Sequence, residues 1–141
     1  IDNSSLTECP LKVKSQIKIA EYMESFSNNN FKNAANAIID LANNANHYLN
    51  ERAPWKLIKD ISNKGIVAHD IYSVLESCRI IGILLNPIVP NLSNRILQQL
   101  KIESSTINFK KSLDWGLLDP SNGLQDPTPV MEKIEFNENS V

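Results

Sequence analysis

The 141-residue sequence has few glycines, cysteines and histidines: four, two and two, respectively. So few glycines argue against a β-rich fold and against a glycine-rich loop that binds phosphate. Cys9 and Cys78 show neither metal-ligand spacing nor a disulfide framework, and His47 and His69 have no ligand partner nearby. No serine or cysteine has a base and an orienting group beside it. The sequence therefore predicts no metal site and no catalytic site in this chain.

Long apolar runs are also absent. No stretch approaches the roughly 20 apolar residues that span a bilayer, and the polar first residues do not resemble a signal peptide. We therefore expect no membrane partner, and the unpaired cysteines favour a reducing, cytoplasmic location. The length suits one domain with a hydrophobic core, in which we expect Cys78 to be buried. Because the chain begins at Ile1, we expect a piece excised from a longer protein.

Charge is unevenly distributed, although the net charge is only −2. Residues 114–141 carry six acidic residues and one basic residue, so we expect this segment to be a poor surface for RNA. Residues 52–64, in contrast, hold four basic residues and one acidic residue. An anionic partner is thus expected at a local basic patch and not over the whole surface.

Apolar residues recur every three or four positions over most of the chain, which is the pattern of amphipathic helices. The expected helices cover residues 11–27, 31–52, 70–85 and 90–100. The asparagine run 28–30 offers an N-cap for the second helix. This predicts an all-α, antiparallel bundle of about four helices. The residues expected to be buried together between the second and third helices are Ile38, Leu41, Tyr48, Val74, Cys78, Ile81 and Leu85. The expected apolar face of the first helix is Val13, Ile17, Ala20, Met23 and Phe26.

Gly82 lies inside the third expected helix, where glycine costs about 1 kcal/mol relative to alanine. We therefore expect a neighbouring backbone to pack closely against it. Beyond Lys101 the helical period fails, and turn and breaker signals fill residues 112–130. We divide the chain into a helical bundle, residues 1–113, and an irregular tail, residues 114–141, that packs on the bundle. The expected anchors of the tail are Trp115, Val130, Met131 and Ile134.

The second expected helix runs into Ala53-Pro54, and Trp55 follows at once. Proline lacks a backbone N–H and disfavours helix at the preceding residue, so Trp55 is placed on a corner. A rigidly mounted flat ring, with Lys56 and Lys59 nearby, suits an unpaired nucleic-acid base. The alternative is that Trp55 is a partly buried packing residue, which is the commoner role of a tryptophan after a helix.

Three motifs follow one another along the chain. The first is Ala45–Leu49 (Ala-Asn-His-Tyr-Leu), followed by Ala53–Leu57 (Ala-Pro-Trp-Lys-Leu). The second is Arg79–Pro90, which ends in Leu-Leu-Asn-Pro-Ile-Val-Pro, and the third is Gly123–Ile134 in the tail. In this order and spacing they resemble the anticodon-binding domain of methionyl-tRNA synthetases over roughly residues 13–135. The resemblance implies a class I synthetase helix bundle that begins just after the opening helix of the family's domain.

The resemblance also implies roles for individual residues. Trp55 is expected to contact the first base, a cytosine, of the CAU anticodon of methionine tRNA. Pro54 is expected to fix the corner and touch the same base. The amide of Asn46 is expected to pair with a base edge or, alternatively, to form a cap or an inter-helix hydrogen bond. The possible phosphate contacts, which are otherwise solvated surface residues, are Arg52, Lys56 and Lys59.

The parent protein implied by the resemblance is a methionine–tRNA ligase, whose separate catalytic domain uses ATP with Mg²⁺. This chain lacks the signatures of that domain, so we expect no cofactor here. The expected partners are methionine tRNA and the parent's own catalytic domain. Two alternatives remain at this point: the equivalent bundle of a sister class I synthetase, and a non-catalytic helical protein-interaction module in which Trp55 anchors an interface.

Overall fold

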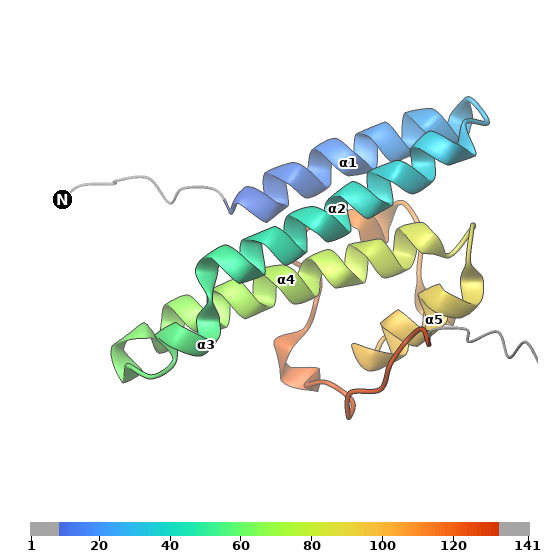
Figure 1. Ribbon diagram of the computed structural model, residues 1–141. Coiled ribbons are helices and arrows are strands. Elements are labelled where there is room, and N and C mark those ends of the chain that lie inside the picture. The colour runs from blue at the N-terminus through green and yellow to red at the C-terminus, as the bar shows by residue number, and fades with distance from the viewer. Residues whose placement is uncertain (1–8, 133–141) are drawn as a thin grey trace, which may run out of the picture.

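The computed structural model describes residues 9–132, in which all regular secondary structure is helical. The long helices are α1 (Pro10–Ser27), α2 (Phe31–Arg52), α4 (Lys64–Leu85) and α5 (Pro90–Gln99). α2 packs against both α1 and α4, and α5 folds back beneath the C-terminal half of α4 (Figure 1). The prediction of an all-α bundle of about four helices is confirmed.

Short elements connect the helices. α3 (Pro54–Leu57) and the 3₁₀ turn η1 (Ile61–Asn63) link α2 to α4 at one end of the molecule (Figure 1). The N-cap of α2 is Asn30, as predicted, and its side chain accepts the N–H of Asn33 at 3.1 Å. The 3₁₀ turns of the C-terminal region are η2 (Ser104–Thr106), η3 (Lys111–Leu113) and η4 (Pro120–Asn122).

The start of α4 differs from the prediction, which placed it near Asp70. The helix begins at Lys64 because the turn η1 leads directly into it. The carboxylate of Asp60 caps that turn by accepting the N–H of Ser62 at 2.9 Å. Two more helical turns thus lie between the Trp55 corner and Asp70 than the apolar period indicates.

The core lies between the long helices. Its most buried members are Tyr22, Ala34, Ala37, Ile38, Leu41, Ile80, Ile83, Leu84 and Leu97. Ile38, Leu41 and Ile81 are buried as predicted, whereas the other four residues of the predicted set are only partly buried: Tyr48, Val74, Cys78 and Leu85. The reason is that the most buried side of α4 also carries polar residues: Asp70, Ser73, Glu76, Ser77 and Arg79. The apolar residues alone therefore do not mark this side of α4.

The predicted face of α1 is wrong in the first half of the helix, where the exposed residues are Val13, Ile17 and Ala20. Leu11, Ser15 and Tyr22 are buried instead. Ser15 is tolerated inside because its hydroxyl donates to the carbonyl of Leu11 at 2.7 Å. The last two residues of the predicted face pack partly against the core, as expected: Met23 and Phe26.

Gly82 is a position of close helix contact. A Cβ added there would lie 3.0 Å from Leu97 Cδ2 and 3.2 Å from Ile96 Cγ2. The neighbours are therefore side chains of α5 and not a backbone, as the sequence analysis expected. Ser93 of the same helix donates its hydroxyl to the carbonyl of Gly82 at 2.6 Å. Glycine thus lets α5 cross α4 at short range.

A buried ion pair on α4 attaches the C-terminal region to the bundle. Arg79 Nη2 lies 2.7 Å from Glu76 Oε1, and both side chains are almost fully buried. The guanidinium also donates to the carbonyl oxygens of Ser112 and Asp114. The carboxylate of Glu76 accepts the N–H groups of three consecutive tail residues at 2.7–3.0 Å: Gly116, Leu117 and Leu118. Two side chains of one helix therefore order an irregular segment that has no regular structure of its own.

In the described part of the tail, residues 114–132, the anchors differ from the predicted ones. Trp115 packs partly against the core, and Val130 is partly buried, whereas Met131 is 69% exposed. Ile134 lies outside the described residues. The buried anchors that the sequence analysis missed are Leu113 and Leu118. Both leucines lie within the segment that Glu76 and Arg79 hold, residues 112–118, so the polar contacts fix which leucines turn inward.

Replacing Glu76 by glutamine is expected to lower the free energy of unfolding near neutral pH by about 2–3 kcal/mol, since hydrogen bonds to charged groups contribute about 1.5–3 kcal/mol. Burial by itself raises the pKa of Glu76, but the Arg79 guanidinium and the tail N–H groups outweigh it and hold this pKa below its usual value. A carboxylate whose pKa is lowered by folding stabilises the fold at pH values above its unfolded-state pKa of about 4.3. This stabilisation is lost as the pH falls through the folded-state pKa.

Thermal unfolding of wild type and E76Q at a series of pH values checks this. The stability difference should be complete above about pH 5 and shrink below about pH 4. A difference that does not change with pH would contradict the role given to the ionised carboxylate.

Candidate nucleic-acid interface

The corner predicted around Pro54 is present. α2 ends at Arg52, and Ala53 adopts the left-handed conformation (φ 43°, ψ 58°) while its N–H still donates to Leu49 O at 3.0 Å. Pro54 then opens α3 and is buried. Trp55 stands next to this buried proline and is 51% exposed. The backbone of the corner is thus fixed from inside, while about half of Trp55 remains open to solvent.

Asp70 of α4 holds the last turn of α2. Its buried carboxylate accepts the hydroxyl of Tyr48 at 2.7 Å and Nε of Arg52 at 2.9 Å. Burial and the bond to Asp70 raise the pKa of the Tyr48 hydroxyl, which keeps it a donor. The hydrogen bond to Asp70 likewise raises the pKa of Arg52. Arg52, expected as a phosphate contact, is therefore partly engaged within the fold, with its side chain 43% exposed.

The lysines beside the corner are available to a partner. Lys56, Lys59 and Lys64 are exposed, and within the described part of the chain none of them forms an ion pair with an acidic side chain. The one acidic residue of this patch, Asp60, turns its carboxylate back to the N–H of Ser62. That backbone hydrogen bond lowers the pKa of Asp60. The patch keeps a net positive charge next to the exposed ring, which suits an anionic strand with an unstacked base.

Asn46 lies on a different side of α2. Its side chain is exposed, and the described residues offer it no cap or inter-helix hydrogen bond, which was the alternative role. At about 100° per residue, Asn46 is roughly 120–160° around the helix from Tyr48 and Arg52. The structure therefore gathers Pro54, Trp55 and the lysines at the corner and leaves Asn46 about two turns away on the exposed surface.

Two features of this end of the molecule escaped the sequence analysis. The first is the acceptor Asp70, whose partners Tyr48 and Arg52 stand one helical turn apart on α2; only the fold brings them to this carboxylate of α4. The second is apolar exposure: Ile58 is 49% and Ile61 is 79% exposed. Ile58 follows Trp55 at a spacing of three residues in a helical segment, so the two side chains lie on the same face. An isoleucine in a short turn gives no sequence signal of exposure.

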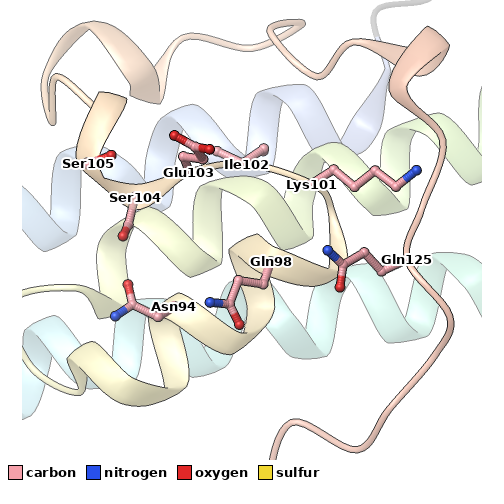
Figure 2. Close-up of a pocket in the computed structure, with 8 residues that line it drawn as sticks. All are labelled: Asn94, Gln98, Lys101, Ile102, Glu103, Ser104, Ser105 and Gln125. Carbon is pink, nitrogen blue, oxygen red and sulfur yellow. The ribbon is translucent and has the colours of Figure 1, made fainter.

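The pocket at α5 offers a contrast to the corner. It has a volume of about 440 Å³ and lies between α5, the segment that follows it and the tail (Figure 2). Its lining is mostly amide and hydroxyl groups, with one lysine and one glutamate and no aromatic side chain: Asn94, Gln98, Lys101, Ile102, Glu103, Ser104, Ser105 and Gln125. Without a stacking face or a net positive charge, this pocket does not suit an RNA base.

Comparison with known proteins identifies the family of this chain. Residues 3–140 match the family model described as the anticodon binding domain of methionyl tRNA ligase. The chain belongs to this family. Its relatives include the methionine–tRNA ligases of Synechocystis sp. (35% identical over 90% of this chain) and Caldanaerobacter subterraneus (39% identical over 72%). The chloroplastic/mitochondrial methionine–tRNA ligase of Arabidopsis thaliana is 31% identical over 91% of this chain.

These relatives are much longer than this anticodon-binding domain. The chain spans 26%, 15% and 21% of the lengths of the three relatives, respectively. The family favours the methionyl type over a sister class I synthetase, and an anticodon-binding domain implies binding to tRNA. No helix within residues 9–132 is long and apolar enough to cross a membrane.

Changing Lys56 or Lys59 to glutamine is expected to weaken RNA binding about equally for all anticodon sequences, because phosphate contacts carry no base information. Each lost contact should also reduce the slope of log affinity against log salt by about 0.7, the value for a single strand. Binding titrations at several salt concentrations measure both effects.

The matched control for these variants is Lys32→Gln. Lys32 is exposed at the other end of α2, about 30 Å of helix from Arg52. If the Lys32 variant reduces the salt slope as much as the corner variants do, the patch has no special part in RNA binding.

Proposed function

We propose that this domain binds the anticodon loop of methionine tRNA and that Trp55 stacks on the first base of the CAU anticodon. The observation that carries the proposal is the half-exposed ring of Trp55 on a buried proline corner, beside the exposed lysines Lys56 and Lys59. Pro54 fixes the corner and supports the ring. Asn46, about two turns from the corner, contacts the edge of a neighbouring base. Lys56 and Lys59 contact phosphates, and the exposed part of Arg52 adds a third positive charge.

We propose further that the parent protein is a methionine–tRNA ligase, in which a separate catalytic domain uses ATP with Mg²⁺. The curated relatives with that name, of which this chain spans about a quarter or less, support this assignment. The residues of this chain supply binding only: the corner holds the anticodon while the chemistry takes place elsewhere. The cytoplasmic location stays a prediction, since one relative is chloroplastic/mitochondrial.

The second candidate function, a protein-interaction module anchored by Trp55, remains only as an alternative outcome. An interface built on one aromatic anchor would not depend steeply on salt, whereas RNA binding through lysines should. Within residues 9–132, neither Lys56 nor Lys59 forms an ion pair with an acidic side chain, which favours RNA.

Trp55→Ala in the full-length protein is expected to weaken binding to methionine tRNA by roughly five- to 150-fold, because base–aromatic stacking contributes about 1–3 kcal/mol. Charging of the tRNA should fall accordingly, while activation of methionine without tRNA stays nearly unchanged. Because the ring is half exposed, the melting temperature should change little. Affinity, both activities and thermal unfolding are measured on the same preparation.

Trp115→Ala is the matched control, since the chain contains only these two tryptophans. Trp115 packs against the core from the tail, so its loss should lower the melting temperature and leave anticodon binding nearly intact. The assignment of Trp55 fails if Trp55→Ala melts much earlier but binds tRNA normally when folded.

A further inference from the structure

The buried carboxylate of Asp70 joins α4 to the end of α2. Its side chain is 2% exposed, and its two oxygens accept from two different donors. Oδ1 accepts the hydroxyl of Tyr48 at 2.7 Å, and Oδ2 accepts Nε of Arg52 at 2.9 Å. These donors stand at a spacing of four residues in the final turns of α2, so one group of α4 holds the end of α2 at two points.

This contact lies directly before a strained residue. Ala53 follows Arg52 with φ 43°, a conformation that L-residues other than glycine seldom adopt. Such a conformation persists only where the surrounding structure enforces it. Besides the backbone hydrogen bonds of Ala53, two side chains restrain it: Asp70 before it, through Arg52, and the buried ring of Pro54 after it. The direction of Trp55 depends on both restraints, because this residue is the next in the chain.

We propose that Asp70 is a positioning residue for anticodon binding, which holds the Trp55 corner in the orientation that receives the base. This inference rests on the proposed function. Asp70 itself does not touch RNA, since it is buried beneath Tyr48 and Arg52. Its effect is to order the ring before binding, so that stacking does not have to restrict a mobile corner. Loss of such ordering is expected to weaken binding by about two- to tenfold.

The test uses Asp70→Asn and Tyr48→Phe in full-length protein that also carries Trp115→Phe, so that Trp55 is the only tryptophan of this chain. If the rest of the protein contains tryptophans, the protein is labelled with fluorinated tryptophan and followed by fluorine NMR instead of fluorescence. The signal of Trp55 is then assigned as the one that disappears in Trp55→Phe. Two quantities are measured: the mobility of the Trp55 ring without RNA, and the affinity for anticodon stem-loops that differ only in the first anticodon base. Asp70→Asn should raise ring mobility and weaken binding of the cytosine loop by about two- to tenfold, with less discrimination between the loops. Tyr48→Phe removes one of the two donors to Asp70 and keeps the aromatic ring of residue 48. It should change ring mobility and affinity in the same direction as Asp70→Asn, by a smaller amount.

Glu76→Gln is the matched control, because it alters the other buried carboxylate of α4, which binds the tail and not α2. It should lower stability but leave the mobility of Trp55 and the discrimination between loops unchanged. If Glu76→Gln weakens cytosine-loop binding as much as Asp70→Asn does, Asp70 acts only through general stability and the inference is wrong. The inference is also wrong if Asp70→Asn changes neither quantity or, should that variant not fold, if Tyr48→Phe changes neither. Failure of the proposed function is seen separately, as wild-type protein that does not distinguish the loops.

Discussion

An ionised carboxylate can be buried only where donors surround it, and α4 buries two such groups on the side that faces the rest of the domain. Asp70 takes its donors from the end of α2, and Glu76 takes its donors from Arg79 and the tail. Each carboxylate therefore fixes a segment that helix packing alone leaves free. α4 therefore holds both the Trp55 corner and the C-terminal region. The position of the corner relative to the core follows from its attachment to α4.

The two tryptophans show how differently this scaffold uses the same side chain. Trp115 is drawn onto the core by the segment that Glu76 and Arg79 bind, whereas Trp55 is turned outward by a buried proline. A contiguous exposed apolar patch can mark an interaction surface, and Ile58 and Ile61 are exposed near Trp55. The exposed lysines near this ring support the proposed contact between RNA and the corner.

Sequence reasoning succeeded where local chemistry decides the outcome. The proline after Ala53, the asparagine cap at residue 30 and the double-proline turn before α5 act within a few residues, and the helices begin or end there. The buried face of α4 was not predictable, because Asp70 and Glu76 become favourable inside only when donors from distant segments reach them. The same limit applies to the tail, where Leu113 and Leu118, not Met131, are buried. The corner was located, but the carboxylate that holds it was not.

Emission of Trp55 during RNA binding tests the central claim most directly. The measurement uses Trp115→Phe protein in which Trp55 is the only emitting tryptophan and compares anticodon stem-loops with and without cytosine at the first anticodon position. A base stacked on the indole should quench its emission, so saturating cytosine loop should quench Trp55 strongly and the substituted loop much less. Saturable binding of the cytosine loop with unchanged Trp55 emission would contradict the account, because the RNA would then bind away from the corner.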